Sequence, residues 1–328
     1  MKHRIFVPIT MMSVVAASAV ADVDIRTQCA GNEDPVNMVF TLTDNCITDE
    51  TLLIPDGWTV DGNGYTITAV DPAGGHFRGA VVRNGGAVAH LQNLTVTAAG
   101  LANVCDRGDD RLRGIMFEAA SGSILNNTVI GINQGFSGCQ EGNAIEVRNA
   151  PFDGTHPNTQ FVTINHNFVD DYQKTGIVAN GDVEVTISNN FVGSADLPEN
   201  IAANSVQLGF GASGTVNNNV IEGNQWNGAS NYVATAVLIY WAGDVNVNHN
   251  SIFGEGTDVG ILAQYSGRVN IMNNDVARTV QPGDPKDDYG VGVWFYNNAG
   301  KSKLVRNDFS GWNYNYFGAD LDRANVSD

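Results

Sequence analysis

The chain contains VTINHNFV at residues 162–169 and VTISNNFV at residues 185–192, nearly the same eight letters 23 positions apart (185 − 162). The shared core of the pattern is an aliphatic residue, two variable residues, an asparagine, one variable residue and a second, mostly apolar residue. A pattern that recurs in phase along a sequence indicates a fold built from repeated units. Seven segments fit it: ILNNTV, INHNFV, ISNNFV, VNNNVI, VNHNSI, IMNNDV and LVRNDF.

The fourth position of every copy is an asparagine. At a bend between strands, stacked asparagines can hydrogen-bond to one another and to exposed backbone groups at each step of about 4.8 Å. The alternative, glycosylation sequons or loose polar turns, accounts for a single case such as NNT but not for seven in phase. The sequence therefore predicts a structural ladder of Asn127, Asn167, Asn190, Asn219, Asn250, Asn274 and Asn307.

A second repeated motif precedes the first: GIMFE, AIEVR, GIVAN, SVQLG, AVLIY, GILAQ and GVWFY. Its apolar second position lies 12 to 14 residues before the partner asparagine in six copies, and 22 before it in the copy that carries an insertion at residues 150–158. Two strands at a nearly fixed offset, with no helical periodicity, predict a solenoid. Alternation along each strand points Ile, Val, Leu, Phe and Ala inward, so we expect a coil of parallel strands.

On these motifs the chain resembles the right-handed parallel β-helix family, which is pectate-lyase-like in broad terms. IPDGWTVDGNGYTI at residues 54–67 is similar to the opening turn of that family, and the likeness covers roughly residues 54–309. The resemblance and the usual crossover rule imply a right-handed coil. The expected fold is all-β, a single-stranded right-handed parallel β-helix of about eight turns. Seven turns come from the motif pairs above, and an eighth comes from the earlier pair GAVVR and HLQNLTV. Leu94 replaces the ladder asparagine in that first pair.

Three segments are expected along the chain. Residues 1–21 have basic residues, an apolar run and a closing Ala-Val-Ala, the pattern of a cleaved signal peptide, so the mature chain is expected to begin at Asp22. Residues 22–53 are expected to cap the open end of the coil, and residues 54–328 to form the β-helix domain. The apolar run is too short for a membrane anchor, and no second stretch of spanning length follows. The sequence therefore predicts a secreted protein without a membrane span.

The net charge of −18 becomes −20 once Lys2 and Arg4 leave with the signal peptide. A surface this acidic argues against nucleic acid as a partner and against binding a bare polyanion by bulk attraction. The four cysteines form an even set, which in an oxidising compartment indicates disulfides. Three pairings exist, and we favour Cys29–Cys46 with Cys105–Cys139 because neighbours in sequence are neighbours in a stacked fold.

The first strand of each pair should present its third and fifth positions outward. The fifth positions are Arg83, Glu118, Arg148, Asn180, Gly209, Tyr240, Gln264 and Tyr296, and the third are Val81, Met116, Glu146, Val178, Gln207, Leu238, Leu262 and Trp294. Such a mixture of charged, amide and aromatic groups suits a linear polysaccharide. The alternative for Arg83, Glu118 and Arg148 is an inert, salt-bridged ladder.

Loops that enter these strands add charge. CDRGDDRLRG, GCQEGN and DDYQKTG precede successive copies and should overhang the same face. Two carboxylates there could catalyse hydrolysis, whereas a lysine or arginine with a lowered pKa could remove the proton beside a uronate carboxylate. The candidate catalytic residues are Lys174, Asp171, Glu146 and Asp170. The candidate substrate-binding residues are Arg83, Glu118, Glu141, Arg148, Tyr172, Gln207, Tyr240, Trp294 and Tyr296. Structural salt bridging among the loops is the alternative.

No known catalytic signature of the family is present. Gly-His-Gly and Arg-x-Lys of polygalacturonase-like hydrolases, Arg-x-Pro-x-x-Arg of pectate lyases and Asp-Pro-His of mannuronan epimerases are missing from the sequence. Asp106, Asp109 and Asp110 could bind calcium but lack the alternating ligand spacing, and no zinc spacing is visible. The sequence supports a protein that binds, and cleaves or epimerises, an extracellular polysaccharide or cell-surface glycan. The alternative is a non-catalytic adhesive or matrix solenoid.

Overall fold

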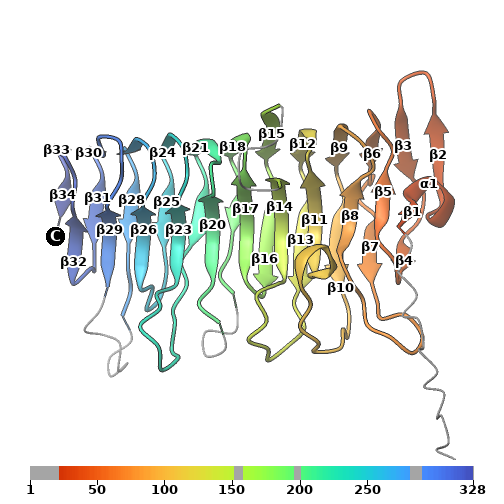
Figure 1. The fold of residues 1–328 in the computed structure, drawn as a ribbon, viewed down its shortest axis with the longest axis horizontal. Helices are drawn as coiled ribbons and strands as arrows, with labels where there is room; N and C mark the ends of the chain where they lie inside the picture. The colour runs from red at the N-terminus through yellow and green to blue at the C-terminus, as the bar shows by residue number, and fades with distance from the viewer. Residues whose placement is uncertain (1–21, 151–157, 196–200, 281–289, 328) are drawn as a thin grey trace, which may run out of the picture.

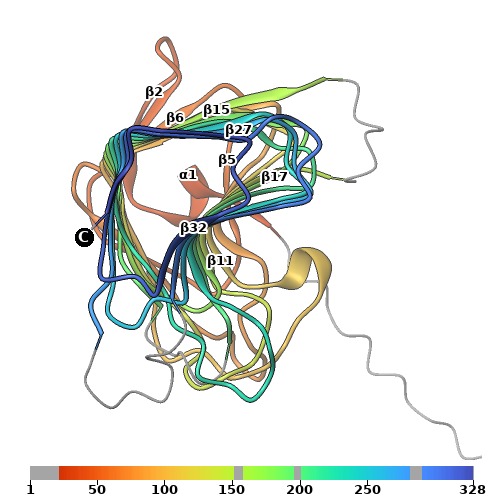
Figure 2. The same ribbon diagram turned by 90° about the vertical axis from the view of Figure 1, so that its left-hand side faces the viewer.

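The structure, a computed structural model, describes residues 22–150, 158–195, 201–280 and 290–327. In this part of the chain three long sheets run side by side, and each coil contributes one strand to each sheet. Figure 1 shows the strands stacked along the long axis, and Figure 2 shows the coil end on. The predicted parallel coil is confirmed, with three strands per coil instead of two.

Sheet 1 faces the viewer in Figure 1 and carries the second sequence motif. Its strands pair in parallel. They are β1 (Val23–Asp24), β5 (Leu52–Ile54), β8 (Ala80–Asn84), β11 (Arg113–Glu118), β14 (Asn143–Asn149), β17 (Thr175–Gly181), β20 (Asn204–Gly209), β23 (Thr235–Tyr240), β26 (Val259–Gln264), β29 (Val291–Tyr296) and β32 (Tyr314–Phe317).

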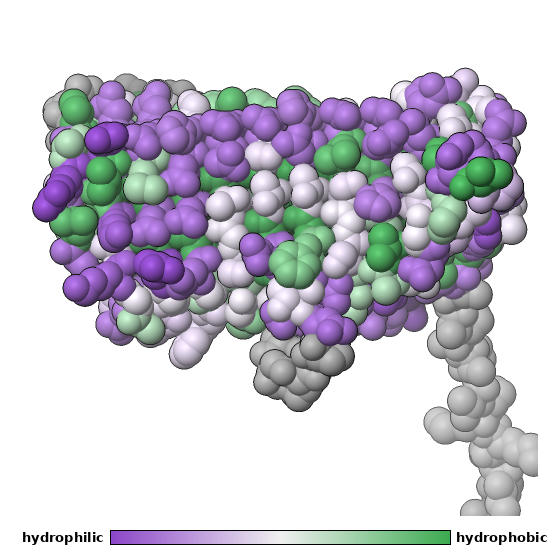
Figure 3. All heavy atoms as spheres, turned by 90° about the horizontal axis from the view of Figure 1, so that it is seen from above, coloured by the Kyte–Doolittle hydropathy of each residue, from purple (hydrophilic) through white to green (hydrophobic). Residues whose placement is uncertain are grey.

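Sheet 2 forms the upper face in Figure 1 and begins with an antiparallel hairpin. Seen from above in Figure 3, this face is mostly hydrophilic or neutral. Its strands are β2 (Gly31–Asp34), β3 (Val39–Leu42), β6 (Thr59–Asp61), β9 (Val88–Gln92), β12 (Ser121–Leu125), β15 (Gln160–Asn165), β18 (Val183–Ser188), β21 (Ser213–Asn217), β24 (Val245–Asn248), β27 (Val269–Met272), β30 (Lys303–Val305) and β33 (Leu321–Arg323).

Sheet 3 consists of short strands of two to five residues. The asparagine motif spans the end of a sheet 2 strand, a corner and the start of a sheet 3 strand, which is why the sequence suggests one strand there and the structure has two. The strands are β4 (Cys46–Thr48), β7 (Thr66–Ala69), β10 (Thr95–Ala98), β13 (Thr128–Ile132), β16 (Phe168–Tyr172), β19 (Phe191–Val192), β22 (Val220–Glu222), β25 (Ser251–Phe253), β28 (Asp275–Ala277), β31 (Asp308–Ser310) and β34 (Val326–Ser327).

From β5 to β34 the described strands make ten coils (30 strands, three per coil), against the predicted eight or so. The coil of β5 to β7 has no ladder asparagine, and the coil of β32 to β34 has Asp322 where the motif has an aliphatic residue. The extra coils were missed because the repeat pattern is imperfect at both ends.

The segment before the first full coil is already part of the solenoid. β1, β3 and β4 join the three sheets, and β5 crosses the expected boundary between residues 53 and 54. The short helix α1 (Ile25–Gln28) lies within the outline of the coil in Figure 2, with Ile25 buried in the core. The disulfide Cys29–Cys46 ties this segment together, and Cys105–Cys139 is the second bridge, as predicted.

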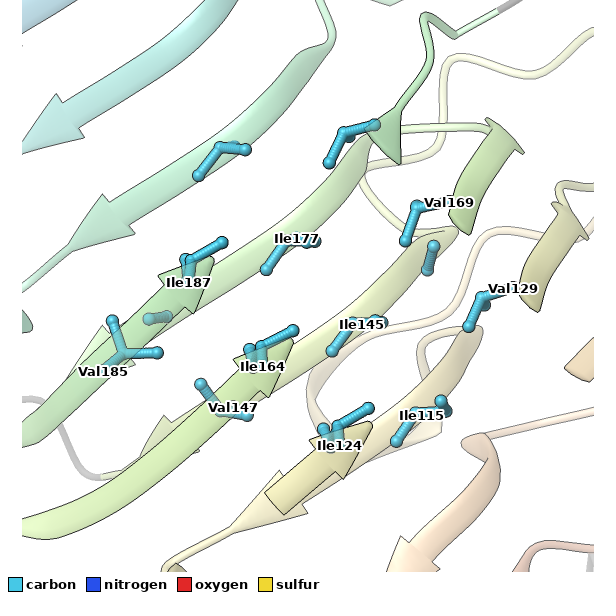
Figure 4. Close-up of a cluster of buried hydrophobic side chains, with 14 of the residues drawn as sticks. Ile115, Ile124, Val129, Ile145, Val147, Ile164, Val169, Ile177, Val185 and Ile187 are labelled. Atoms are coloured by element: carbon cyan, nitrogen blue, oxygen red, sulfur yellow. The ribbon is translucent and has the colours of Figure 1, made fainter. Parts of the chain in front are cut away.

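The core is a continuous stack of aliphatic side chains inside the coil. Ile115, Ile145 and Ile177 are successive members of one column in sheet 1, and each is fully buried. Figure 4 shows them facing Ile124 and Ile164 of sheet 2 across the interior. Burial contributes about 25 cal/mol for each Å² of apolar surface removed from water, so each coil stabilises its two neighbours.

The predicted asparagine ladder is confirmed. In each step, for example from Asn190 to Asn219, one Oδ1 atom accepts the backbone N–H at 2.9 Å and the Nδ2 group at 3.0 Å of the asparagine in the preceding coil. The Nδ2 group of Asn190 also donates to the carbonyl of Ile164. The ladder extends one step further than predicted, since Asn325 accepts both bonds from Asn307.

Candidate functional site

The outward face of sheet 1 has the register that the sequence predicts from β11 onward. Met116, Glu146, Val178, Gln207, Leu238, Leu262 and Trp294 form one column, and Glu118, Arg148, Asn180, Gly209, Tyr240, Gln264 and Tyr296 form another. The predicted alignment fails at β8, where Arg83 pairs with Met116 and not with Glu118. A shift of two residues preserves in–out alternation, so the alternation could not reveal it.

A position that the pairing of sheet 1 passes over in successive coils accounts for a second error at β8. Val82 pairs with Ile115, and the pairing passes over Val81 and Gly114. Val81, expected outward, is buried in the core. Gly114 faces Val129 and Ile132 in the interior, which shows that this position turns inward at the corner of the coil.

The described connections from sheet 3 to sheet 1 at residues 70–79, 99–112, 133–142 and 223–234 form a wall beside the outward face; they hang below sheet 1 in Figure 1. The connection from β10 to β11 contains the short helix η1 (Gly108–Asp110). The Cys105–Cys139 disulfide joins it to the next connection. Because of this wall, the outward residues Met116, Glu146 and Val178 are buried. The face is therefore the floor of a groove that runs along the coil axis.

Two adjoining hollows lie in the groove, and Gln140 and Lys174 line both. The cationic hollow, of about 610 Å³, is lined by Gly108, Arg111, Arg113, Gln140, Asn143, Glu146, Arg148, Lys174, Thr175, Val178, Asn180, Gln207 and Phe210. The apolar hollow, of about 720 Å³, is lined by Gln140, Lys174, Ile201, Ala202, Asn204, Trp226, Asn231, Tyr232, Val233, Leu238, Tyr240, Leu262 and Gln264.

A buried charge network lies at the floor of the cationic hollow. The Nε group of Arg113 donates to Glu146 at 2.6 Å, and Asn143 donates to the same carboxylate oxygen at 2.8 Å. Arg148 binds Glu118 and Asp109 and lies 3.8 Å from Glu146. The bond from Arg148 holds the pKa of the Asp109 carboxyl below its usual range. Glu146 is 4% exposed and is held by Arg113, Asn143 and Arg148, so it anchors the two arginines.

Two cations of the cationic hollow have no carboxylate partner among the described residues. The Nζ group of Lys174 donates to the backbone carbonyl of Ala202. Burial lowers the pKa of Lys174 to about 8. The Nε group of Arg111 is buried without a hydrogen-bond partner. An anionic group in the hollow would satisfy both side chains.

Lys174 and Glu146 line the same hollow, as the register predicts. The expectation that DDYQKTG is a loop is wrong, because residues 168–172 form β16 of sheet 3. Asp170 and Asp171 therefore lie in a different sheet and line neither hollow, and Asp171 instead accepts a hydrogen bond from Asn133 at 2.7 Å.

Tyr172 and Glu141 hold the fold together and do not contact the groove. Tyr172 is 1% exposed; its hydroxyl donates to Gly193 at 2.9 Å, and burial raises its pKa. Glu141 is also 1% exposed and accepts the backbone N–H groups of Asp106 at 2.9 Å and Leu112 at 2.8 Å. Their predicted substrate-binding roles are wrong, because their polar atoms are buried and already bonded.

The remaining predicted binding residues divide along the groove. Gln207 lines the cationic hollow and Tyr240 the apolar hollow. Trp294 and Tyr296 lie further along the same columns and pack against each other, with ring centroids 6.4 Å apart. Arg83 lines a smaller hollow of about 220 Å³ with Asp109, next to the cationic one.

The sequence did not reveal a row of aromatic residues one position beyond the predicted columns. Phe210, Trp241 and Tyr265 follow successive sheet 1 strands and all have a left-handed backbone, with φ near 54°. The Trp241 and Tyr265 rings stack with centroids 5.0 Å apart, and Trp241 is 52% exposed. Bulky residues rarely adopt this conformation, and such strain is often found at functional sites.

Two of the three aspartates considered for calcium already have partners. Asp106 lies 2.8 Å from the Nε2 atom of His76 and 4.0 Å from Arg78, and Asp109 binds Arg148. Both would have to leave these partners to bind calcium, and a calcium site in this segment stays a prediction. In the described part of the chain no helix has the length and apolar character to cross a membrane.

A family model described as a right handed beta helix region matches residues 153–319, just over half of the chain. The chain belongs to this family. The fold is therefore a right-handed parallel β-helix, as the sequence predicted. No curated protein matches this β-helix chain significantly.

Solved structures with little sequence identity share the β-helix. The enzymatically active domain of tailspike protein 2 from bacteriophage CBA120 is 12% identical, with a TM-score of 0.57 over 88% of this chain and 43% of that one. The full-length tailspike protein, from an Escherichia coli O157:H7 bacteriophage, is 12% identical, with a TM-score of 0.56 over 88% of this chain and 38% of that one. A mutant of the periplasmic alginate epimerase AlgG is also 12% identical, with a TM-score of 0.40 over 90% of this chain and 79% of that one. This chain spans less than half of either tailspike chain, and the likeness concerns the fold alone.

Proposed function

We propose that this protein is secreted, binds an acidic extracellular polysaccharide in the sheet 1 groove, and acts on it by removing a proton beside a carboxylate. The main support is charge: Arg111, Arg113, Arg148 and Lys174 line the cationic hollow, and three carboxylates, Glu146, Glu118 and Asp109, bind the second and third of these cations. The excess is one positive charge (4 − 3) in a chain of net charge −18, and Arg111 and Lys174 have no carboxylate partner among the described residues. A cationic groove in an acidic protein attracts an anionic ligand locally.

Lys174 is the proposed proton acceptor. Its neutral amine would take the proton from the ring carbon next to the carboxylate, and the C–H electron pair would move into that carboxylate as an enediolate. Arg111, which lines the same hollow, would stabilise this charge through its guanidinium group. Transfer of a proton from solvent water to the opposite face of that carbon gives the epimer. In the elimination, the electron pair instead forms a carbon–carbon double bond, the C–O bond to the glycosidic oxygen at the neighbouring carbon breaks, and the oxygen takes a proton from the Lys174 ammonium or from water.

Hydrolysis has less support. It requires two carboxyl groups, one of them able to donate a proton. Among the described residues that line the cationic hollow, Glu146 is the one carboxylate, and it is bound by Arg113 and Asn143. The proposed reaction is therefore elimination or epimerisation.

The N-terminal segment and the disulfides support the proposed secretion. Residues 1–21 lie outside the described residues; we propose that they are a cleaved signal peptide, and that residues 22–53, whose strands join the three sheets, close the first end of the β-helix domain. Two disulfides are typical of proteins that mature in an oxidising compartment.

A binding screen with acidic and neutral polysaccharides tests the proposal. Wild-type protein should bind polyuronates and release them as salt rises. Arg111→Gln should weaken this binding by about tenfold to a hundredfold, because a charge-assisted hydrogen bond contributes about 1.5–3 kcal/mol. Arg107→Gln is the matched control, an exposed arginine of the same loop that lines neither hollow, and should bind like wild type.

Product analysis in deuterated water separates the reactions. Elimination gives unsaturated chain ends, epimerisation gives deuterium at the inverted carbon of an intact chain, and hydrolysis gives new reducing ends without unsaturation. Binding with no chemical change would identify the adhesive, non-catalytic solenoid, and preference for neutral polysaccharides would overturn the proposal.

A further inference from the structure

The apolar hollow differs in chemistry from the cationic hollow beside it. Val233, Leu238 and Leu262 contribute apolar surface, Trp226, Tyr232 and Tyr240 contribute rings, and Lys174 at the shared edge is its one charged lining residue among those described. Its volume and its mainly apolar lining with a few polar groups are typical of a small-molecule site.

Apolar residues on the outside of a solenoid need an explanation, since outward positions normally face water. Val259, Leu262 and Val291 are buried together on the outer side of sheet 1, with Leu238 and Trp294 packed against them. This cluster is separate from the core inside the coil. Along one outward column the side chains change from Glu146 in β14 to Leu238 in β23 and Leu262 in β26.

A polymer that lies in the cationic hollow along the coil axis enters the apolar hollow next, because the two share Lys174 and Gln140. Successive coils advance about 4.8 Å, comparable to the length of one sugar residue. A second carboxylate at Leu238 would lose water without gaining a cation. A methyl group at the same position would be removed from water, which favours binding.

We propose that the apolar hollow binds the methyl group of a neutral sugar about two coils along the groove from the acidic one, carried either by an acetyl group or by a deoxy sugar. The inference rests on the proposed function and specifies its substrate as a heteropolysaccharide. Tyr240 and Trp226 would pack against the sugar ring, and Gln264, Asn204 and Asn231 offer hydrogen bonds to its hydroxyls.

Titration calorimetry with matched polymers tests it. The first pair is an acidic heteropolysaccharide with acetyl esters and the same polymer after mild alkaline de-esterification. The second pair is an acidic polymer with deoxy-sugar residues and a plain polyuronate. Wild type should prefer the methyl-bearing member of at least one pair by about tenfold or more, the range for one small apolar group in a pocket. The pair that shows the preference identifies the source of the methyl group.

Leu238→Asn should reduce that ratio to about one. Val220→Asn is the matched control, an exposed outward residue in sheet 3, and should keep the wild-type ratio. No preference in wild type, or an unchanged ratio in Leu238→Asn, overturns the inference while polyuronate binding leaves the proposed function standing. If wild type binds no acidic polymer, both fail.

Discussion

The Oδ1 atom of Asn250 accepts two hydrogen bonds from Asn219, from its backbone N–H at 3.0 Å and from its Nδ2 group at 2.9 Å. Asn219 in turn accepts the same two bonds from Asn190 and donates to the carbonyl of Ile187. Each ladder asparagine thus joins three successive coils.

Asn219→Ala should lower the free energy of unfolding by about 1–3 kcal/mol, because buried donors and acceptors on both neighbouring coils lose their partners. Chemical denaturation measures it. Asn217→Ala, in an outward position of β21, should change stability by less than about 0.5 kcal/mol. Equal effects in the two variants would contradict a structural ladder.

The two disulfides should have separable effects. Mass spectrometry of native protein should find no free thiol. Removing either bridge by paired Cys→Ser changes should cost about 3 kcal/mol through greater freedom of the unfolded chain. Only loss of Cys105–Cys139, which joins two connections of the groove wall, should also weaken polyuronate binding; loss of Cys29–Cys46 should leave the affinity intact. Equal affinities in both variants would show that the wall does not need its bridge.

The rate of the proposed reaction should rise with pH through about 8. Burial lowers the pKa of Lys174 to that value, and only the neutral amine accepts a proton. A pH–rate profile measures this, and Lys174→Met should remove turnover with little change in melting temperature. Lys174→Arg keeps the positive charge, so it should retain binding without turnover. Full activity in Lys174→Met would rule out this residue as the base.

Glu141→Gln tests whether this carboxylate holds the groove wall. Glutamine replaces one acceptor oxygen by a donor, so one of the two backbone N–H groups bound by Glu141 loses its partner. We expect the free energy of unfolding to fall by about 1–3 kcal/mol and hydrogen exchange to become faster at residues 105–112. Glu184→Gln, an exposed position of β18, should show neither change, and slow exchange in Glu141→Gln would argue against the proposed bracing.

The coil was predictable because two short motifs recur in phase. Alternation and a fixed offset placed Glu146, Val178 and Gln207 in one outward column, which the strand pairing confirms. The strands of sheet 3 were not predictable in the same way. β19 has only two residues, too few to show alternation. β16 contains two adjacent aspartates, a residue type that is more typical of loops than of strands.

The groove wall could not be predicted because no repeat encodes it. Its connections vary in length, so the position of Arg111 depends on η1 and on contacts far along the sequence. Glu141 and Lys174 show the limit most clearly. Both are charged residues close to the start of a sheet 1 strand, yet one is fully used by backbone N–H groups and the other reaches the groove.

Each coil packs mainly on its two neighbours, so the number of stacked coils sets the length of the groove. Asn250 and Asn274 are 24 residues apart and mark one nearly loop-free coil. Inserting or deleting such a unit would change the groove length by about 4.8 Å while the other coils keep their own contacts. Duplication of one coil is therefore a direct evolutionary route to a protein that holds a glycan longer by one sugar.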